Sequence, residues 1–210
     1  LKQSAIKVRC PQWLSHSDVE QFVLSKQNWL TTKLEQQKHR APIENKYETG
    51  TLVLIDGEKY SLKIVSAKQH SVTIDDENHL LIFSIPTRVV NTENYIKRKL
   101  IEFYCQQAQD YIPNRAHELE TQINAKAKAV ELKVYKRRWG CCYGSGLVRI
   151  NPMLMGAPKW VLDCVIIHEL SHLTHMNHSN AFWDLNKKHC SHCKDSKLWL
   201  KENGHYLQII

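Results

Sequence analysis

The sequence lacks several features that would assign it to a large class of proteins. It has no run of eighteen consecutive apolar residues, so it predicts no transmembrane helix and no membrane partner. Residues 1–20 lack the basic start, apolar centre and small-residue cleavage site of a secretion signal. The seven cysteines are odd in number and lack the regular spacing of a disulfide framework. Reduced thiols and a cytoplasmic location are therefore expected.

Sequence motifs for nucleic-acid or phosphate binding are also missing, although the net charge is +8. The densest basic clusters are Lys97-Arg98-Lys99 and Lys136-Arg137-Arg138, and neither is accompanied by a nucleic-acid-binding motif or a glycine-rich phosphate loop. An ordinary solvated basic surface is the interpretation that we favour. A nucleotide or nucleic-acid partner stays an alternative, because basic charge attracts both.

One stretch of the sequence has the pattern of a metal site. His168-Glu169-Leu170-Ser171-His172 follows a segment that is apolar on nearly all sides, which is typical of a buried helix. Two histidines one turn apart share a helix face and can bind the same metal ion. His178 supplies a third ligand once the helix has ended near Met176-Asn177.

Three protein ligands and an open fourth position are typical of catalytic zinc. The sequence therefore predicts one zinc ion bound by His168, His172 and His178, and no other cofactor. Glu169 is placed to take a proton from water as the general base.

The first 90 residues predict a small β-rich α+β part, which we assign as one domain, with residues 91–210 as the second. A capping box at Ser17–Glu20 predicts the start of an amphipathic helix that runs to about Lys38. Asp56-Gly57 suits a tight hairpin turn. The remaining expected elements are a strand at 5–9, a polar connector at 39–47, strands at 52–55 and 60–65, and a second hairpin over 72–83.

The second domain begins with a long helical pattern from Thr92, and Pro113 predicts a kink or two consecutive helices. Pro158 is expected in the first turn of the metal-binding helix. After His178, Ser179 can cap a short helix whose Phe182-Trp183 pair is expected to be a core anchor that fixes the position of His178.

A hairpin is expected over residues 132–151, just ahead of the metal-binding helix. Its strands are predicted at 132–136 and 147–151, joined by a turn-rich loop. Such a hairpin would place an edge strand across the metal, and an edge strand can hold an extended peptide by main-chain hydrogen bonds. This edge is the predicted binding place of a peptide or protein substrate.

Other side chains carry weaker signals. Arg138 and Tyr143 are the local candidates for stabilising an oxyanion, and His175 is either a supporting group or an exposed residue at the helix end. Cys142 favours a packing role over a nucleophilic one. Cys190-Ser191-His192-Cys193 resembles half of a zinc knuckle, but no second Cys-x-x-Cys pair completes a structural site.

Together these motifs resemble the YgjP-like metallopeptidase family, which is related to SprT-type and other short zincin domains. The resemblance is carried by Arg138-Trp139-Gly140-x-Cys142, Ile150-Asn151, Ala157-Pro158, the His-Glu-x-x-His motif, Asn177-His178-Ser179-x-x-Phe182-Trp183 and Lys197-x-Trp199-Leu200-Lys201-x-x-Gly204. It implies an α+β fold with a zincin-like metallopeptidase core, and zinc on the three histidines with Glu169 as general base. The chain departs from the family at Cys141, where serine is common, and carries His175 where metzincins have glycine.

The function that fits these observations is that of a zinc-dependent metallopeptidase. Two alternatives stay open. The same metal chemistry would serve hydrolysis of a nucleoside triphosphate or another phosphoanhydride. A non-catalytic, DNA-associated protein built on the zincin fold is the other, and the intact Glu169 argues against it.

Overall fold

The computed structural model describes residues 8–39 and 46–209, and the chain divides into two compact units, residues 1–44 and 45–210. The predicted domain boundary between residues 90 and 91 lies inside the second of these units. The division into domains at that point stays a prediction. In the described part of the chain, each helix is too short or too polar to cross a membrane.

The first unit contains two helices, α1 (His16–Ser25) and α2 (Gln27–His39), where the sequence predicted one. Ser15, two residues before the predicted cap, accepts a hydrogen bond from the Asp18 amide at 3.2 Å. In the last turn of α1 the Ser25 hydroxyl donates to the Phe22 carbonyl at 2.7 Å and competes with the helix hydrogen bonds there. Residues 5–7 of the strand predicted at 5–9 lie outside the described part, and Val8 and Arg9 belong to no strand.

The second unit begins with a four-stranded sheet in the order β1-β2-β4-β3. Both predicted hairpins are confirmed, and the two are joined by a parallel pairing of β2 with β4. Asp56 and Gly57 turn the first hairpin with φ values of 50° and 92°. The strands are β1 (Leu52–Ile55), β2 (Glu58–Ala67), β3 (Ser71–Asp75) and β4 (Leu80–Pro86).

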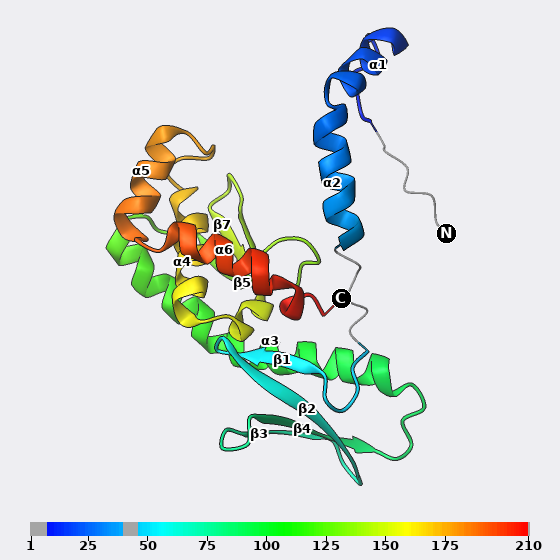
Figure 1. The fold of residues 1–210 in the computed structure, drawn as a ribbon. Coiled ribbons are helices and arrows are strands. Elements are labelled where there is room, and N and C mark those ends of the chain that lie inside the picture. The colour runs from blue at the N-terminus through cyan, green and yellow to red at the C-terminus, as the bar shows by residue number, and fades with distance from the viewer. Residues whose placement is uncertain (1–7, 40–45, 210) are drawn as a thin grey trace. The chain divides into compact units, whose positions relative to one another are not determined.

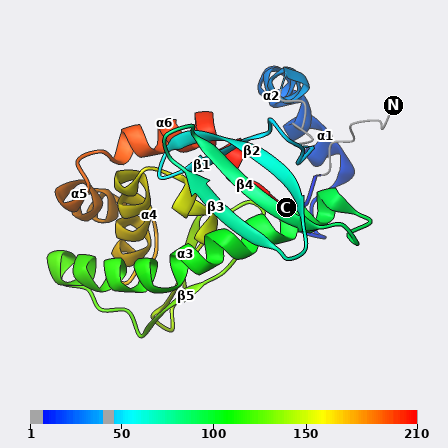
Figure 2. The ribbon, with the colours of Figure 1, turned by 90° about the horizontal axis from the view of Figure 1, so that it is seen from below.

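The next element, α3 (Thr92–Ile123), is a single helix of 32 residues. Of the two alternatives predicted at Pro113, two consecutive helices are therefore wrong, and a kink stays a prediction. The buried side chains of α3 recur every three or four residues along its whole length, from Ile96 through Ile112 to Ile123. Packing of this continuous stripe compensates for the backbone hydrogen bond that Pro113 cannot donate. Figures 1 and 2 show α3 running past both the four-stranded sheet and α4.

Replacing Pro113 by alanine is expected to stabilise the protein, because alanine restores the missing donor and has the best helix propensity. Proline in a helix interior costs about 3 kcal/mol relative to alanine, and the existing packing recovers part of that cost. A gain of about 1–2 kcal/mol would raise Tm by roughly 2–8 °C. Calorimetry measures it, with Gln106→Ala on the exposed face of α3 as control. A lower Tm for Pro113→Ala would show that α3 requires the proline.

A second, three-stranded sheet follows in the order β5-β7-β6, and here the predicted strands need correction. The first strand is β5 (Ala129–Leu132), not 132–136, and it pairs in parallel with β7 (Leu147–Ile150). The hairpin is formed instead by β6 (Gly140–Cys142) and β7, which pair antiparallel. Residues 133–139 turn away because the buried Asn151 amide bonds the carbonyls of Tyr135 and Arg138.

The last part of the chain is helical and packs on α3 and on both sheets. The turn of the first hairpin bonds η1 through the Gly57 amide and the Gly156 carbonyl at 2.9 Å, which ties the four-stranded sheet to the entry of α4. The elements are η1 (Pro152–Gly156), α4 (Lys159–Ser171), α5 (Asn180–His189), α6 (Cys193–Asn203) and η2 (Gly204–Leu207).

Candidate metal centre

The metal-binding motif lies on α4, which is buried on most sides, as predicted. Pro158 is the N-terminal cap of α4, one residue before the first turn in which it was expected. The helix ends at Ser171, about one and a half turns earlier than expected, and His172 is its C-terminal cap. The Ser171 hydroxyl donates to the Ile167 carbonyl at 2.7 Å. The amides of residues 172–174 each bond the carbonyl three residues back instead of four, which is the 3-10 pattern typical of a tightening helix end. The early end leaves room for residues 173–179 to bring His178 back toward α4.

The structure brings the three predicted metal ligands together. One nitrogen of each of His168, His172 and His178 lies within 4.8 Å of the others, and the Nε2 atoms of His168 and His178 are 3.1 Å apart. His172 Nδ1 lies 3.0 Å from the His175 carbonyl, a partner that fixes Nδ1 as the protonated nitrogen and leaves Nε2 free. Burial, the other two histidines and Lys197 lower the pKa of His168 to about 4, so its imidazole is neutral and can donate a lone pair.

Two aromatic side chains of α5 hold this cluster. The fully buried Phe182 ring lies 4.5–5.0 Å from the centroids of all three imidazoles. Trp183 stacks on His178 with a centroid distance of 5.3 Å and an interplanar angle of 20°. Ser179 caps α5 by accepting from the Phe182 amide, as predicted. The cap and the two rings therefore fix the position of His178, which lies outside any helix.

Glu169 lies next to the cluster on α4, and only 7% of its surface is exposed. Its carboxylate accepts a hydrogen bond from the backbone amide of Cys142 on β6. Burial raises the pKa of Glu169 to about 7, while the Cys142 amide and the Arg138 charge act in the opposite direction. A carboxylate with that pKa can both accept and release a proton near neutral pH.

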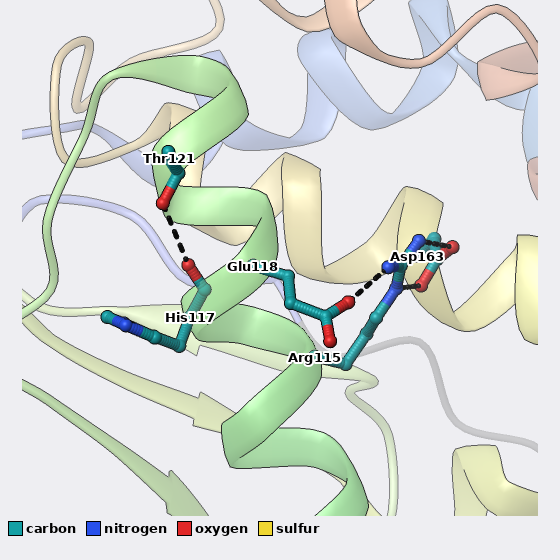
Figure 3. A network of polar contacts seen from close by, with 5 residues as sticks. All are labelled: Arg115, His117, Glu118, Thr121 and Asp163. Carbon is teal, nitrogen blue, oxygen red and sulfur yellow. Dashed lines mark hydrogen bonds and ion pairs between the residues drawn. The ribbon is translucent and has the colours of Figure 1, made fainter.

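An ion pair fixes α4 on α3 one turn before the motif. The Arg115 guanidinium bonds both carboxylate oxygens of Asp163, each at 2.8 Å, and also bonds Glu118 (Figure 3). The same turn of α3 carries a weaker bond from the Thr121 hydroxyl to the His117 carbonyl at 3.4 Å. A two-pronged arginine–carboxylate pair restricts rotation as well as distance, so it orients the face of α4 that carries His168.

Of the other predicted site residues, Arg138 lies at the cavity of the site, Tyr143 lies at a hairpin turn, and His175 supports a histidine through its backbone. Arg138 lines the same cavity as His168 and Glu169. Tyr143 lies at the β6–β7 turn with 40% of its surface exposed, and its hydroxyl accepts from Arg149 at 3.2 Å. His175 supports His172 through its backbone, because the His175 carbonyl bonds the His172 ring.

The cysteines near the site behave as structural thiols. Burial and the charge of Glu169 raise the pKa of Cys142 to about 11, which agrees with a packing role and disfavours a nucleophile. Cys193 donates to the buried Asn186 amide oxygen. Among the described residues, the histidine cluster is the one group with metal-ligand spacing, so Cys190 and Cys193 gain no support as a second metal site.

Three residues that shape the site were not recognised as functional from the sequence. A Cβ atom built on Gly140 would lie 2.7 Å from Glu169 Cγ, so glycine is needed for β6 to approach the carboxylate. An isolated glycine in a strand is a general signal of such close approach. Lys197 holds its ammonium 3.9 Å above the Trp183 ring, and Asn151 anchors the chain segment that carries Arg138.

Replacing Asn151 by alanine is expected to destabilise the protein and weaken activity. The side chain is 1% exposed, donates to the Tyr135 and Arg138 carbonyls at 3.0 and 2.9 Å, and accepts from the Met153 amide. Leaving these buried groups unpaired costs about 2–4 kcal/mol in total. Urea unfolding measures this loss, with Asn114→Ala on the exposed face of α3 as control. Equal midpoints for the two variants would contradict the anchoring role.

Comparison with solved structures gives two metallopeptidase zymogens. One is jannalysin of Methanocaldococcus jannaschii, with 19% identity and a TM-score of 0.38 over 42% of this chain and 92% of that one. The other is abylysin of Pyrococcus abyssi, with 18% identity and a TM-score of 0.37 over 42% of this chain and 91% of that one. No curated protein matches the chain.

Comparison with protein families gives a match over a larger part of the chain. The model of the family described as YgjP-like, metallopeptidase domain, matches residues 1–203. The match includes the His-Glu-x-x-His helix, the His178 segment and the β6–β7 hairpin, which meet in the geometry described above. The mixed helix and sheet content agrees with the predicted α+β class. The chain therefore belongs to the YgjP-like metallopeptidase family, whose members are metal-dependent hydrolases.

Proposed function

We propose that this metallopeptidase uses one zinc ion held by His168, His172 and His178, with Glu169 as the general base. The observation that carries the proposal is the convergence of three imidazole nitrogens within 4.8 Å beside a buried carboxylate. Three imidazoles are a donor set that catalytic zinc uses, and they leave a coordination position open. The group fits the residues present, because His172 and His178 are already oriented by His175 and Trp183.

A zinc ion bound there would supply Lewis acidity to the scissile carbonyl and acidify a water molecule. Glu169 would take the proton of the attacking water and pass it to the leaving amine. The Cys142 amide holds the Glu169 carboxylate in place for both transfers. Arg138, which lines the same cavity, is the group we assign to the developing negative charge on the carbonyl oxygen.

The substrate backbone is proposed to lie along β6, the edge strand of the three-stranded sheet nearest α4. The Asn151 amide bonds the Trp139 carbonyl, and the Tyr143 amide bonds the Leu147 carbonyl. In an antiparallel pair such bonds alternate, so the polar backbone groups of Gly140 and Cys142 point away from β7. The Cys142 amide is used by Glu169, and the remaining outward groups are free to bond an extended peptide.

The proposal is tested by measuring hydrolysis with and without the metal. The purified protein is stripped with a chelator, reloaded with zinc, and incubated separately with an unfolded protein mixture and with nucleoside triphosphates. We expect peptide bonds to be cut by the zinc-loaded protein only, and zinc to bind at about one ion per chain. Hydrolysis of triphosphates with intact proteins would favour the phosphoanhydride alternative. Cleavage that is unchanged after metal removal would refute a metal mechanism.

A further inference from the structure

Two neighbouring cavities share Cys193 and Lys197 of α6, and one of them reaches the histidine cluster. The first has a volume of about 280 Å³ and is lined by both His168 and Glu169. The second has a volume of about 630 Å³ and lies between α5 and the start of α6, with Trp183 in its wall. A bound substrate whose scissile bond lies at Glu169 would therefore place its neighbouring side chains in or beside these cavities.

The charged side chains that line the two cavities are basic, with Glu169 as the exception. They are Arg137, Arg138, Lys187, Lys194 and Lys197. The nearby acidic side chains of α5 and α6, Asp184 and Asp195, line neither cavity, and Asp195 pairs with His192. A cavity lined by charges of one sign concentrates the electrostatic field, so this side of the site attracts anions and repels cations.

Lys197 joins the two cavities and lies close to the metal ligands. Its ammonium is 3.9 Å above the Trp183 ring, and the same ring stacks on His178. A cation over an indole face is held in place at a modest gain in energy. Its charge is also felt by His168. The proposed mechanism gives Lys197 no role in the chemistry, so its position needs another explanation.

We propose that these cavities form a carboxylate-binding subsite, and that the substrate is a peptide with aspartate or glutamate beside the scissile bond. The proposal rests on the proposed peptidase function and specifies its substrate class. A carboxylate would neutralise Lys197 and the neighbouring basic groups, whereas a lysine or arginine side chain would be repelled. An apolar side chain would desolvate these cations without a partner.

The subsite is tested by binding and cleavage, measured separately. Labelled peptides with acetylated and amidated ends carry glutamate, glutamine or lysine in the same frame, and bind to zinc-loaded Glu169→Gln protein in an anisotropy assay. We expect at least tenfold tighter binding of the glutamate peptide than of the glutamine peptide at about 50 mM salt, with the difference shrinking as salt screens the charges. A glutamine peptide with a free carboxyl end shows whether a chain terminus serves as well as a side chain.

Lys197→Glu and Lys197→Gln should each reduce the preference for glutamate over glutamine about tenfold. Lys201→Glu, one turn further along the exposed side of α6 and outside both cavities, should leave the preference unchanged. Equal binding of the glutamate and glutamine peptides, or a preference unaffected by either Lys197 variant, overturns the subsite. So does a nucleoside triphosphate that displaces the peptide and is hydrolysed by the wild type.

The two proposals fail in different ways. If the zinc-loaded wild type cuts no peptide while Lys197-dependent binding persists, the peptidase function is wrong and the carboxylate subsite stands. If peptides are cut without preference for acidic residues beside the cleaved bond, the peptidase function stands and the subsite is wrong. Mass spectrometry of a cleaved peptide library gives this second readout.

Discussion

Replacing Glu169 by glutamine is expected to lower kcat for peptide hydrolysis by about 10²–10⁴-fold, because a positioned general base contributes that much to proton transfer. Glutamine keeps the shape of the side chain and still accepts a hydrogen bond from the Cys142 amide, but it cannot take a proton. Steady-state kinetics of the zinc-loaded proteins on a peptide found to be cut by the wild type measure the change.

The control for this prediction is Glu202→Gln, which removes an exposed carboxylate on α6. It should leave kcat unchanged. The Glu169→Gln protein should still bind about one zinc ion, because Glu169 is outside the proposed ligand set. Retained zinc together with full hydrolytic activity would rule out Glu169 as the base. Loss of zinc would show that the carboxylate contributes to the metal site itself.

Replacing Gly140 by alanine is expected to reduce kcat by about 10²-fold, since misplacement of a catalytic group by about 1 Å has effects of this size. The new Cβ would lie 2.7 Å from Glu169 Cγ and 2.9 Å from Glu169 Oε1, closer than non-bonded atoms allow. The Glu169 side chain is buried, so it can avoid the methyl group only by leaving its position beside Cys142. The same kinetics, together with zinc analysis and calorimetry, measure the outcome.

Gly144 provides the matched control on the same hairpin. A Cβ atom built there meets no atom within 4 Å, so Gly144→Ala should retain activity. Both variants should unfold within a few degrees of the wild type, because the clash at Gly140 involves one side chain and no backbone. Wild-type kcat in Gly140→Ala would show that Glu169 tolerates displacement, and would contradict the close-approach argument.

Features set by local sequence were predicted well. The spacing of His168 and His172 fixes their common face on any helix, and Ser179 caps α5 because its hydroxyl reaches an amide three residues on. Asp56-Gly57 forms the hairpin turn because both residues tolerate positive φ. The buried character of α4 also followed from composition alone.

The wrong predictions concern helix and strand boundaries. At these places two nearby residues could both form the cap, or contacts with distant segments set where the element lies. Ser15 and Ser17 are both followed by an acidic residue three positions on, and the structure uses Ser15. Pro113 failed to break α3 because buried contacts continue on both sides of it. The strand predicted at 132–136 formed at Ala129–Leu132 instead, because the Asn151 amide bonds the Tyr135 and Arg138 carbonyls and β5 pairs with β7.

The sequence by itself determined the family, the class of metal-dependent hydrolase and the three histidines that the fold brings together, since each depends on residue type and short-range spacing. Only the tertiary structure decided the surroundings of Glu169 and the charge of the cavities beside it. Gly140 and Lys197 are 29 and 28 residues away from Glu169 along the chain, and no periodicity connects them. They meet at the site because α4 is packed between β6 on one side and α6 on the other, which is a property of long-range packing.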